Sequence, residues 1–213
     1  MNILFCLPGS EYSGRFLTCW TNLLVHCLNK NYKVNVAQRS HDDCYNIRNL
    51  CLGGPNQKPF GGKVDYDYIM WIDNNILFTP DQFEQLLDHD TNIVSGIYLS
   101  DDGKSYSTIQ YWDEDFYKKN GYFKLMTIDE VKDMKSQYGT FPVVATSLGF
   151  MLVKNGVFES MTYPWFKPEI FGFKRIKYLA SEDVSWCLSA AKAGYMVTID
   201  PSIVLKREVV SLL

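Results

Sequence analysis

The chain has few of the features that mark membrane, secreted or nucleic-acid-binding proteins. No apolar run approaches the roughly 20 residues that a transmembrane helix needs, and the N-terminal MNILFCLPG lacks the basic start of a signal peptide. The formal net charge is −3, and Lys and Arg are scattered rather than gathered in a basic stripe. These absences predict a cytoplasmic protein without a transmembrane segment and without a nucleic-acid partner.

Several catalytic and metal-binding motifs are also missing. The six cysteines form no Cys-x-x-Cys motif, and the three histidines show no ligand spacing, which excludes common zinc sites and indicates reduced thiols. No Walker A, G-x-G-x-x-G or G-x-S-x-G sequence occurs. P-loop enzymes are therefore excluded, and dinucleotide oxidoreductases and α/β-hydrolases are disfavoured.

What is present is enough apolar sequence for a sizeable core. Hydrophobic residues make up 46% of the 213 residues and aromatic residues 15%, which suits one globular domain spanning residues 1–213. Aromatic side chains bury a large area, and they also stack on bases and sugars. The composition thus favours a folded domain and is compatible with a sugar or nucleotide ligand.

Apolar periodicity predicts alternating strands and helices. The expected strands are Asn2–Leu7, Tyr32–Gln38, Tyr68–Ile72, Asn92–Leu99, Phe141–Ala145, Gly149–Lys154 and Met196–Ile199. Helices are expected after Ser13, at Tyr45–Cys51, from Thr79, at Asp113–Lys119 and Ile128–Lys135, and from Ser181 to about Ala193. This order predicts an α/β fold with a mixed, mostly parallel central sheet flanked by helices. The aromatic and basic segment Tyr163–Tyr178 is predicted to be a loop.

The strongest candidate for chemistry is the end of the apolar run Tyr68–Ile72. Asp73, Asn74 and Asn75 follow it directly, and ligands of open α/β sheets bind at the carboxyl ends of the strands. Oxygen-bearing side chains at this position can bind Mg²⁺ or Mn²⁺, which in turn neutralises a diphosphate. An ordinary Asp-Asn turn leaving a strand explains the same pattern.

A second candidate is the start of the last helix, SEDVSW. Glu182 and Asp183 are adjacent acids in its first turn, where one can orient an acceptor and the other can accept its proton. Acids that compensate the helix dipole are the alternative explanation. Val184, Leu188 and Ala191 are predicted to form the buried face of this helix.

Basic residues and a glycine complete the candidates. Arg39 and Lys206 follow predicted strands, and Arg48 lies on a short polar segment; each of them can bind phosphate or be a solvated surface charge. Gly149 follows Thr146-Ser147-Leu148, where a missing side chain lets the backbone approach a ligand. A turn between two strands explains this glycine equally well.

Taken in order, these signals resemble the GT-A class of nucleotide-sugar glycosyltransferases, and the resemblance covers nearly the whole chain. The segments WIDNNILFTPDQFEQLL, SGIYL, YPWF and SEDVSWC are most similar to glycosyltransferase domains encoded by large viruses and phages, in particular the N-terminal domain of a chlorella-virus glycosyltransferase. The resemblance implies a GT-A-like, Rossmann-like domain that belongs to a longer protein.

The resemblance also implies roles for individual residues. Asp73 and Asn75 occupy the outer places of the Asp-x-Asp motif that handles the ribose and the Mn²⁺ or Mg²⁺ ion, with Asn74 between them. The other donor-binding positions that it implies are Leu7, Pro8, Gly9 and Arg39 near uracil and ribose, Arg48 near the base or phosphates, Gly149 near the transferred sugar, and Lys206 on the diphosphate. Asp183 matches the catalytic base of inverting members, with Glu182 beside it.

The function expected from this resemblance is transfer of a sugar from a UDP-sugar donor to a glycan or sugar acceptor in glycan synthesis. The aromatic segment Tyr163–Phe173 is expected to stack on the acceptor. The residues leave inverting and retaining chemistry open. The alternatives are a sugar-nucleotide nucleotidyltransferase and a non-catalytic carbohydrate-binding or scaffold domain.

Overall fold

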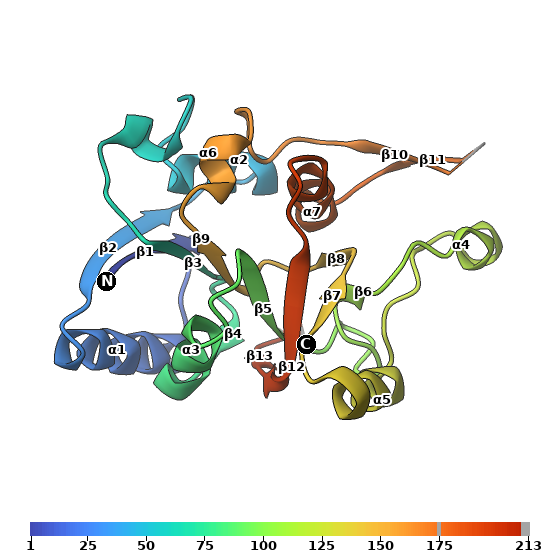
Figure 1. Cartoon of the computed structure of the whole chain (residues 1–213), viewed down its shortest axis with the longest axis horizontal. Helices are drawn as coiled ribbons and strands as arrows, with labels where there is room; N and C mark the ends of the chain where they lie inside the picture. The colour runs from blue at the N-terminus through green and yellow to red at the C-terminus, as the bar shows by residue number, and fades with distance from the viewer. Residues whose placement is uncertain (174–175, 210–213) are drawn as a thin grey trace.

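The computed structural model describes residues 1–173 and 176–209, and a seven-stranded sheet forms its centre (Figure 1). The strand order is β2-β1-β3-β9-β5-β12-β7. The strands are β1 (Asn2–Pro8), β2 (Lys33–Arg39), β3 (Tyr68–Ile72), β5 (Ile93–Ile97), β7 (Phe141–Val143), β9 (Phe150–Lys154) and β12 (Val197–Val204). β1 pairs in parallel with β2 and β3, and β5 pairs in parallel with β12, whereas β9 and β7 run antiparallel to their neighbours.

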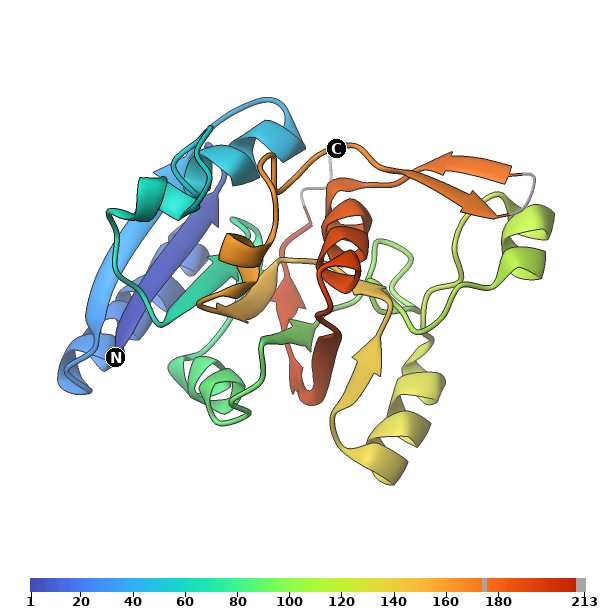
Figure 2. The same cartoon turned by 45° about the horizontal axis from the view of Figure 1, so that its top comes forward.

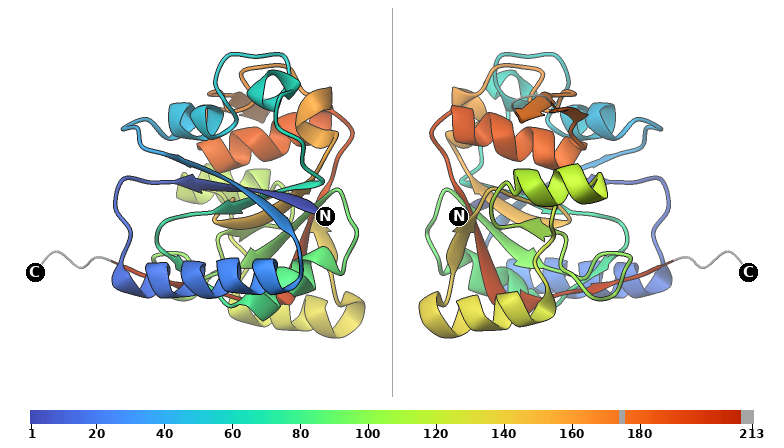
Figure 3. Two further views of the ribbon diagram at one scale, coloured as in Figure 1. Left: turned by 90° about the vertical axis from the view of Figure 1, so that its left-hand side faces the viewer. Right: turned by 90° about the vertical axis from the view of Figure 1, so that its right-hand side faces the viewer.

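Helices cover both sides of the sheet (Figures 1 and 3). One layer contains α1 (Gly14–Asn29), α3 (Pro80–Leu87) and α5 (Ile128–Tyr138), and the other contains α2 (Cys44–Cys51), α6 (Val157–Ser160) and α7 (Glu182–Lys192). The short helices η1 (Pro59–Gly62) and α4 (Glu114–Asn120) lie outside these layers. The predicted fold class, an α/β domain with a mixed, mostly parallel central sheet flanked by helices, is confirmed.

The continuous apolar runs are explained by burial on both faces of the sheet. In β3, Ile69 and Trp71 face one apolar cluster, and Met70 and Ile72 face the other. All four of these side chains are fully buried. A strand with this pattern can lie only in the middle of the sheet, so its carboxyl end opens between two covering layers.

Three short two-stranded sheets lie beside the main sheet. They pair β4 (Ile76–Leu77) with β13 (Lys206–Arg207), β6 (Thr108–Ile109) with β8 (Ala145–Thr146), and β10 (Ile170–Phe173) with β11 (Ile176–Leu179). The predicted strand Phe141–Ala145 is therefore wrong as one unit, because β7 and β8 pair in different sheets. The predicted strand Met196–Ile199 extends much further, through Val204.

The prediction that Tyr163–Tyr178 is a loop is wrong in its second half. β10 and β11 form an antiparallel hairpin that extends from the body of the molecule (Figure 2). In the first half, Trp165 and Phe166 are only 1% exposed. Because they pack in the core, these two rings are not available to stack on an acceptor, and that part of the expectation fails.

Most predicted helix starts are confirmed by their caps. The side chains of Ser13, Thr79 and Asp113 each accept a hydrogen bond from a backbone N–H in the first turn, which satisfies a donor that the helix leaves free. Ser181 occupies the N-cap position of α7, but its hydroxyl makes no capping hydrogen bond.

The predicted inner face of α7 is wrong at Leu188 and Ala191, whereas Val184 is partly buried and packs against the core. Trp186 and Ala190 are buried, whereas Leu188 is partly exposed and Ala191 is exposed. The helix turns the wide Trp186 ring inward, where Phe158 and Phe166 contact it. All six cysteines are unpaired. Among the described residues, no helix combines the length and apolar character needed to cross a bilayer.

Candidate active site

Asp73 lies where β3 ends, at the edge of the sheet where the parallel strands finish. Its backbone N–H donates to the carbonyl of Gly149 at 3.0 Å, just before β9 begins. β9 runs antiparallel to β3, so its first residue lies beside the last residue of β3. This arrangement brings the segment Thr146–Gly149 to the same edge as Asp73.

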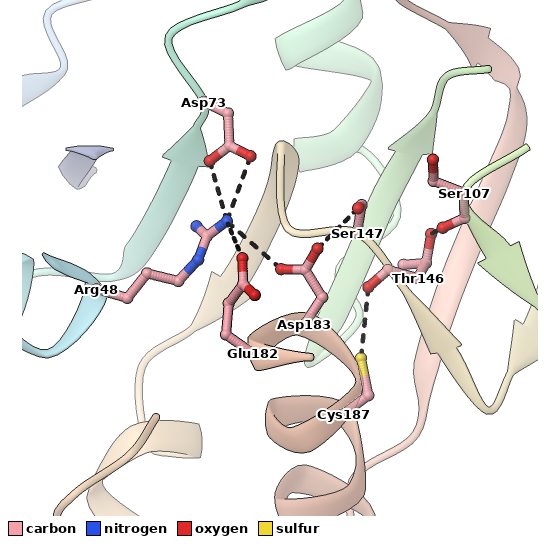
Figure 4. Close-up of polar contacts among 8 residues, drawn as sticks. All are labelled: Arg48, Asp73, Ser107, Thr146, Ser147, Glu182, Asp183 and Cys187. Carbon is pink, nitrogen blue, oxygen red and sulfur yellow. Dashed lines mark hydrogen bonds and ion pairs between the residues drawn. The ribbon is translucent and has the colours of Figure 1, made fainter. Parts of the chain in front are cut away.

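Arg48 of α2 is the buried centre of the site (Figure 4). Its side chain is only 5% exposed, and its guanidinium lies 5.6 Å from the ring centroid of Trp71 and 6.0 Å from that of Phe166. An aromatic face attracts a cation at this distance. The rings of Trp71 and Phe166 therefore hold the Arg48 side chain at the carboxyl edge of the sheet.

Three carboxylates surround the Arg48 Nη2 atom. Asp73 Oδ1 lies at 3.1 Å, Asp183 Oδ1 at 3.4 Å and Glu182 Oε1 at 3.9 Å. Figure 4 shows both acids of α7 pointing from the start of the helix toward Arg48. The predicted metal-binding strand end and the predicted acidic helix start thus meet in one cluster, although 110 positions separate Asp73 from Asp183 along the sequence.

Side chains of α2 also fix the segments that lead to this cluster. The Tyr45 hydroxyl donates to the carbonyl of Ala180 at 2.6 Å, immediately before α7. Asn49 donates to the carbonyl of Phe166 at 2.6 Å and accepts from its N–H at 3.2 Å. These hydrogen bonds position α7 and Phe166 relative to α2. They therefore also position Asp183 relative to Arg48.

The cluster of Arg48, Asp73, Glu182 and Asp183 carries three negative charges and one positive charge when ionised. Burial works to lower the pKa of Arg48, but the three carboxylates outweigh it and raise that pKa above its usual value. Burial raises the pKa of Asp183 to about 6, and Glu182 and Asp73 add to the shift while Arg48 opposes it. An excess of negative charge at the mouth of a buried site favours binding of a further cation.

The cluster offers few side chains that could bind a divalent cation. Arg48 lies among the carboxylates, and within residues 1–173 and 176–209 no group of three or more His, Cys, Asp or Glu side chains could hold a metal ion. However, apart from its ion pair with Arg48 at 3.1 Å, Asp73 Oδ1 makes no hydrogen bond to any described residue. Mg²⁺ in phosphate sites is commonly held by one or two carboxylates together with substrate phosphates. Asp73 fits that arrangement, in which the substrate completes the coordination.

Asn74 and Asn75 occupy different environments beside Asp73. The Asn74 amide donates to the carbonyl of Glu11 at 2.8 Å, which holds it against the loop after β1. The carbonyl of Asn75 accepts from the N–H of Glu208 at 2.8 Å, and its side chain is partly exposed. The backbone of Asn75 thus ties the end of the chain to the site, while its side chain remains a candidate ligand.

The ends of β1 and β2 form one corner of the same edge. Leu7 is buried, Gly9 is partly buried, and the Tyr12 hydroxyl donates to the carbonyl of Leu7 at 2.8 Å. Gly9 has a φ of +152°, and a Cβ there would lie 2.8 Å from Asn74 Cβ. Glycine is therefore required where this loop passes Asn74. The other two predicted residues of this corner, Pro8 and Arg39, pair in register at the ends of the two strands.

Arg39 and Lys206 are exposed and do not reach the cluster. The Arg39 guanidinium donates to the carbonyl of its neighbour Gln38 at 2.7 Å. Lys206 lies on β13 opposite Leu77, and within the described ranges it makes no ion pair. Arg207 instead contacts Asp101 at 3.0 Å. Both predicted phosphate ligands therefore lie at the same edge as Asp73, outside the group around Arg48.

Gly149 is buried, and a neighbouring side chain occupies the space where a Cβ at this position would lie. A Cβ at this position would overlap the Tyr98 hydroxyl and would lie 2.9 Å from the ring carbon Cε1. Tyr98 follows β5 and is 6% exposed. Burial raises the pKa of Tyr98, and the carboxylates of Asp73 and Asp183 raise it further. The phenol thus stays protonated beside the cluster.

Ser147 is a second residue that the sequence analysis did not assign. Its hydroxyl donates to Asp183 Oδ2 at 2.7 Å, on the side away from Arg48 (Figure 4). The two oxygens of Asp183 thus have different partners, which fixes the plane of the carboxylate. Position alone could have suggested both residues, because Tyr98 directly follows β5 and Ser147 lies between β8 and β9.

A cavity of about 180 Å³ opens beside Asp183. Its lining residues are Ser107, Ile109, Leu125, Ala145, Thr146, Ser147, Ser181, Asp183 and Val184. It lies between the start of α7 and the small sheet of β6 and β8. Asp183 therefore faces the Arg48 cluster on one side and a small enclosed space on the other.

No protein-family model matches the sequence, and no curated protein matches it. The fold matches the crystal structure of A197 from STIV. The match covers 99% of this chain and 87% of A197, with a TM-score of 0.56 and 17% sequence identity. At this identity the likeness to A197 shows the fold alone, so the chemistry has to be argued from the residues of this chain.

Proposed function

We propose that this chain is a glycosyltransferase that moves a sugar from a UDP-sugar to an acceptor hydroxyl, with a divalent cation on the diphosphate. One observation carries the proposal: Arg48, Asp73, Glu182 and Asp183 meet at the carboxyl edge of the sheet, beside a cavity that Asp183 lines. A structural ion pair would need one acid opposite Arg48, whereas three carboxylates surround it, and one of them, Asp183, also lines the cavity.

In the proposed reaction the acceptor oxygen attacks the anomeric carbon of the donor sugar. The bond from that carbon to the diphosphate breaks, and its electron pair stays on the diphosphate oxygen. In the inverting version Asp183 accepts the acceptor proton, and Ser147 holds its carboxylate in place through the 2.7 Å hydrogen bond. Glu182 is beside it and orients the acceptor.

Asp73, with the side chain of Asn75, would hold Mn²⁺ or Mg²⁺, which when bound supplies charge neutralisation at the diphosphate. Without a cation, a diphosphate next to three carboxylates and one guanidinium would be repelled. Leu7, Pro8, Gly9 and Arg39 are proposed to contact uracil and ribose. Gly149 and Lys206 are proposed to face the transferred sugar and the diphosphate.

The test measures UDP binding by calorimetry with Mn²⁺ and with a chelator, using the wild-type chain and Asp73→Ala. We expect cation-dependent binding that Asp73→Ala abolishes, because Asp73 is the acidic side chain that β3 delivers to this edge of the sheet. Asp133→Asn on exposed α5 is the matched control and should bind as the wild type does. Unchanged affinity in Asp73→Ala would remove this residue from the site.

A second assay separates the alternatives that the sequence leaves open. UDP release from a panel of UDP-sugars is measured with and without Mn²⁺. A carbohydrate-binding module would release no UDP, and a nucleotidyltransferase would require UTP and a sugar phosphate. Release of UDP only with a donor sugar and a cation is the outcome that the proposal requires.

A further inference from the structure

The cavity beside Asp183 has the size of one ring-shaped group. Its volume of about 180 Å³ is below the roughly 300–1,000 Å³ that pockets for drug-sized ligands enclose. A single sugar ring suits a space of this scale.

The lining of the cavity combines hydroxyl groups with apolar side chains. Ser107, Ser147 and Ser181 contribute polar groups, and Ile109, Leu125 and Val184 contribute apolar ones. A sugar ring presents hydroxyls at its rim and C–H groups on its faces, and a site of this kind matches both. The hydroxyl of Thr146 is already paired with Thr108 at 2.8 Å, so it is not needed for the ligand.

The charge of the lining restricts the ligand further. Asp183 is the one ionisable side chain among the described residues that line the cavity, and no Lys, Arg or His is among them. A buried anion needs a cationic or hydrogen-bonding partner to offset its desolvation. A carboxylate, sulfate or phosphate on the bound ring would instead face the carboxylate of Asp183. Lys124, which precedes the lining residue Leu125 in the sequence, is paired with Glu130 at 2.6 Å.

We propose that this cavity binds the acceptor as one uncharged sugar ring, with the reacting hydroxyl at Asp183. The proposal rests on the glycosyltransferase function above and names the class of its acceptor. It excludes acceptors whose terminal ring carries an acidic group. It also separates the acceptor, in the cavity, from the donor nucleotide, at the ends of β1, β2 and β3.

The test measures ligand binding by saturation-transfer NMR, independently of catalysis. The probes are methyl glycosides of glucose, galactose, mannose, fucose, rhamnose and N-acetylglucosamine, compared with glucuronic acid, galacturonic acid and glucose 6-phosphate, all with UDP and Mn²⁺ present. Two variants block the cavity from opposite walls: Ser107→Trp beside β6 and Val184→Trp in the first turn of α7. Ser136→Trp on exposed α5 controls for an added tryptophan.

We expect at least one neutral glycoside to bind, both blocking variants to reduce that signal at least tenfold, and the acidic probes to give none. UDP affinity, measured by calorimetry, should stay within about twofold in all variants. The inference is overturned if no neutral probe binds, if acidic probes bind equally well, or if both blocking variants keep the signal. Displacement of the glycoside by UDP-glucose but not by UDP would also overturn it, because the cavity would then hold the donor sugar. Failure of UDP itself to bind would instead reject the proposed function.

Discussion

Asp183 differs from the other acids of the cluster because its two oxygens serve different partners. Oδ1 faces Arg48 at 3.4 Å, and Oδ2 accepts from Ser147 at 2.7 Å. The side chain is 18% exposed, so its charge is incompletely solvated. Burial together with the neighbouring carboxylates of Glu182 and Asp73 explains why its pKa rises to about 6 despite Arg48.

The raised pKa of Asp183 predicts that the stability of the fold depends on pH. A carboxyl group whose pKa is higher in the folded state stabilises the fold fully below its unfolded pKa, and that contribution is lost as the pH rises through about 6. Asp183→Asn removes the charge, so we expect the variant to gain up to about 3 kcal/mol at pH 7, since one pKa unit corresponds to about 1.4 kcal/mol. Thermal unfolding of the two proteins from pH 4 to pH 8 measures it.

The difference in melting temperature should vanish near pH 4, where the wild-type carboxyl is protonated. Asp133→Asn should show no such pH dependence. The Asp183→Asn variant is also expected to bind UDP and to lose sugar transfer. A lower melting temperature than wild type at pH 7 would show that Asp183 stabilises the fold, contrary to the role argued here.

Ser147 is predicted to position Asp183 rather than to react. Its hydrogen bond lowers the pKa of Asp183, so Ser147→Ala should move the titration of that carboxyl to higher pH and slow transfer about tenfold, because a hydrogen bond to a charged group contributes about 1.5–3 kcal/mol. Carboxyl-carbon NMR titration and the acid limb of the pH–rate profile measure these effects. Ser147→Thr should restore both, and Ser136→Ala on exposed α5 should change neither; an unshifted titration in Ser147→Ala would remove the role.

At the scale of the elements, the decisive feature is that β9 runs against β3. This direction places the start of β9, rather than its end, beside Asp73. Gly149 directly precedes β9 and lies beside Asp73. Tyr98, which follows the neighbouring β5, fills the space where a side chain of residue 149 would be. The packing of three adjacent strands therefore depends on this glycine.

Gly149→Ala is expected to lower the free energy of unfolding by about 1–3 kcal/mol, the usual cost of overpacking a core. The overlap is with the Tyr98 ring, so Tyr98→Ala in the same chain should remove most of that additional cost. Urea unfolding of the wild type, both single variants and the double variant measures the coupling. Gly14→Ala, at an exposed glycine that has an ordinary backbone φ and open space where a Cβ would lie, is the control. Additive effects in the cycle would show that Tyr98 is not the obstacle.

The segment from Tyr163 to Leu179 shows how one stretch of sequence can divide between two roles. Its aromatic residues and prolines are typical of an exposed loop, yet Trp165 and Phe166 are buried against α6, α7 and Arg48. The hairpin that follows has Ile170 and Leu179 exposed at 67% and 64%. Burial here depends on which elements meet the segment, and composition does not carry that information.

At the scale of the whole molecule, the cluster of acids gives the site a net negative charge that a divalent cation would offset. We predict that Mn²⁺ or Mg²⁺ together with UDP raises the melting temperature. At a concentration 100 times the dissociation constant, a ligand that binds only the folded state stabilises by about 2.7 kcal/mol. This corresponds to roughly 5–10 °C for a domain of this size.

Thermal unfolding with UDP, with cation alone and with both measures this prediction. Asp73→Ala should lose the shift that requires the cation, while Asp133→Asn should keep it. An equal shift in Asp73→Ala would place the cation elsewhere. A shift with UDP alone, unaffected by a chelator, would show that Arg48 and the backbone suffice to bind the diphosphate.

The sequence by itself determined most strands of the central sheet, most helix starts and the buried centre of the sheet, because apolar periodicity, capping residues and continuous apolar runs are local patterns. Only the tertiary structure decided how Arg48 meets Asp73 and Asp183, which lie 25 and 135 positions away along the chain. It also decided that Tyr98 and Ser147 belong to the site and that Trp165 and Phe166 are buried. Such contacts arise from the order and direction of the strands, which bring distant residues together, and no local pattern encodes them.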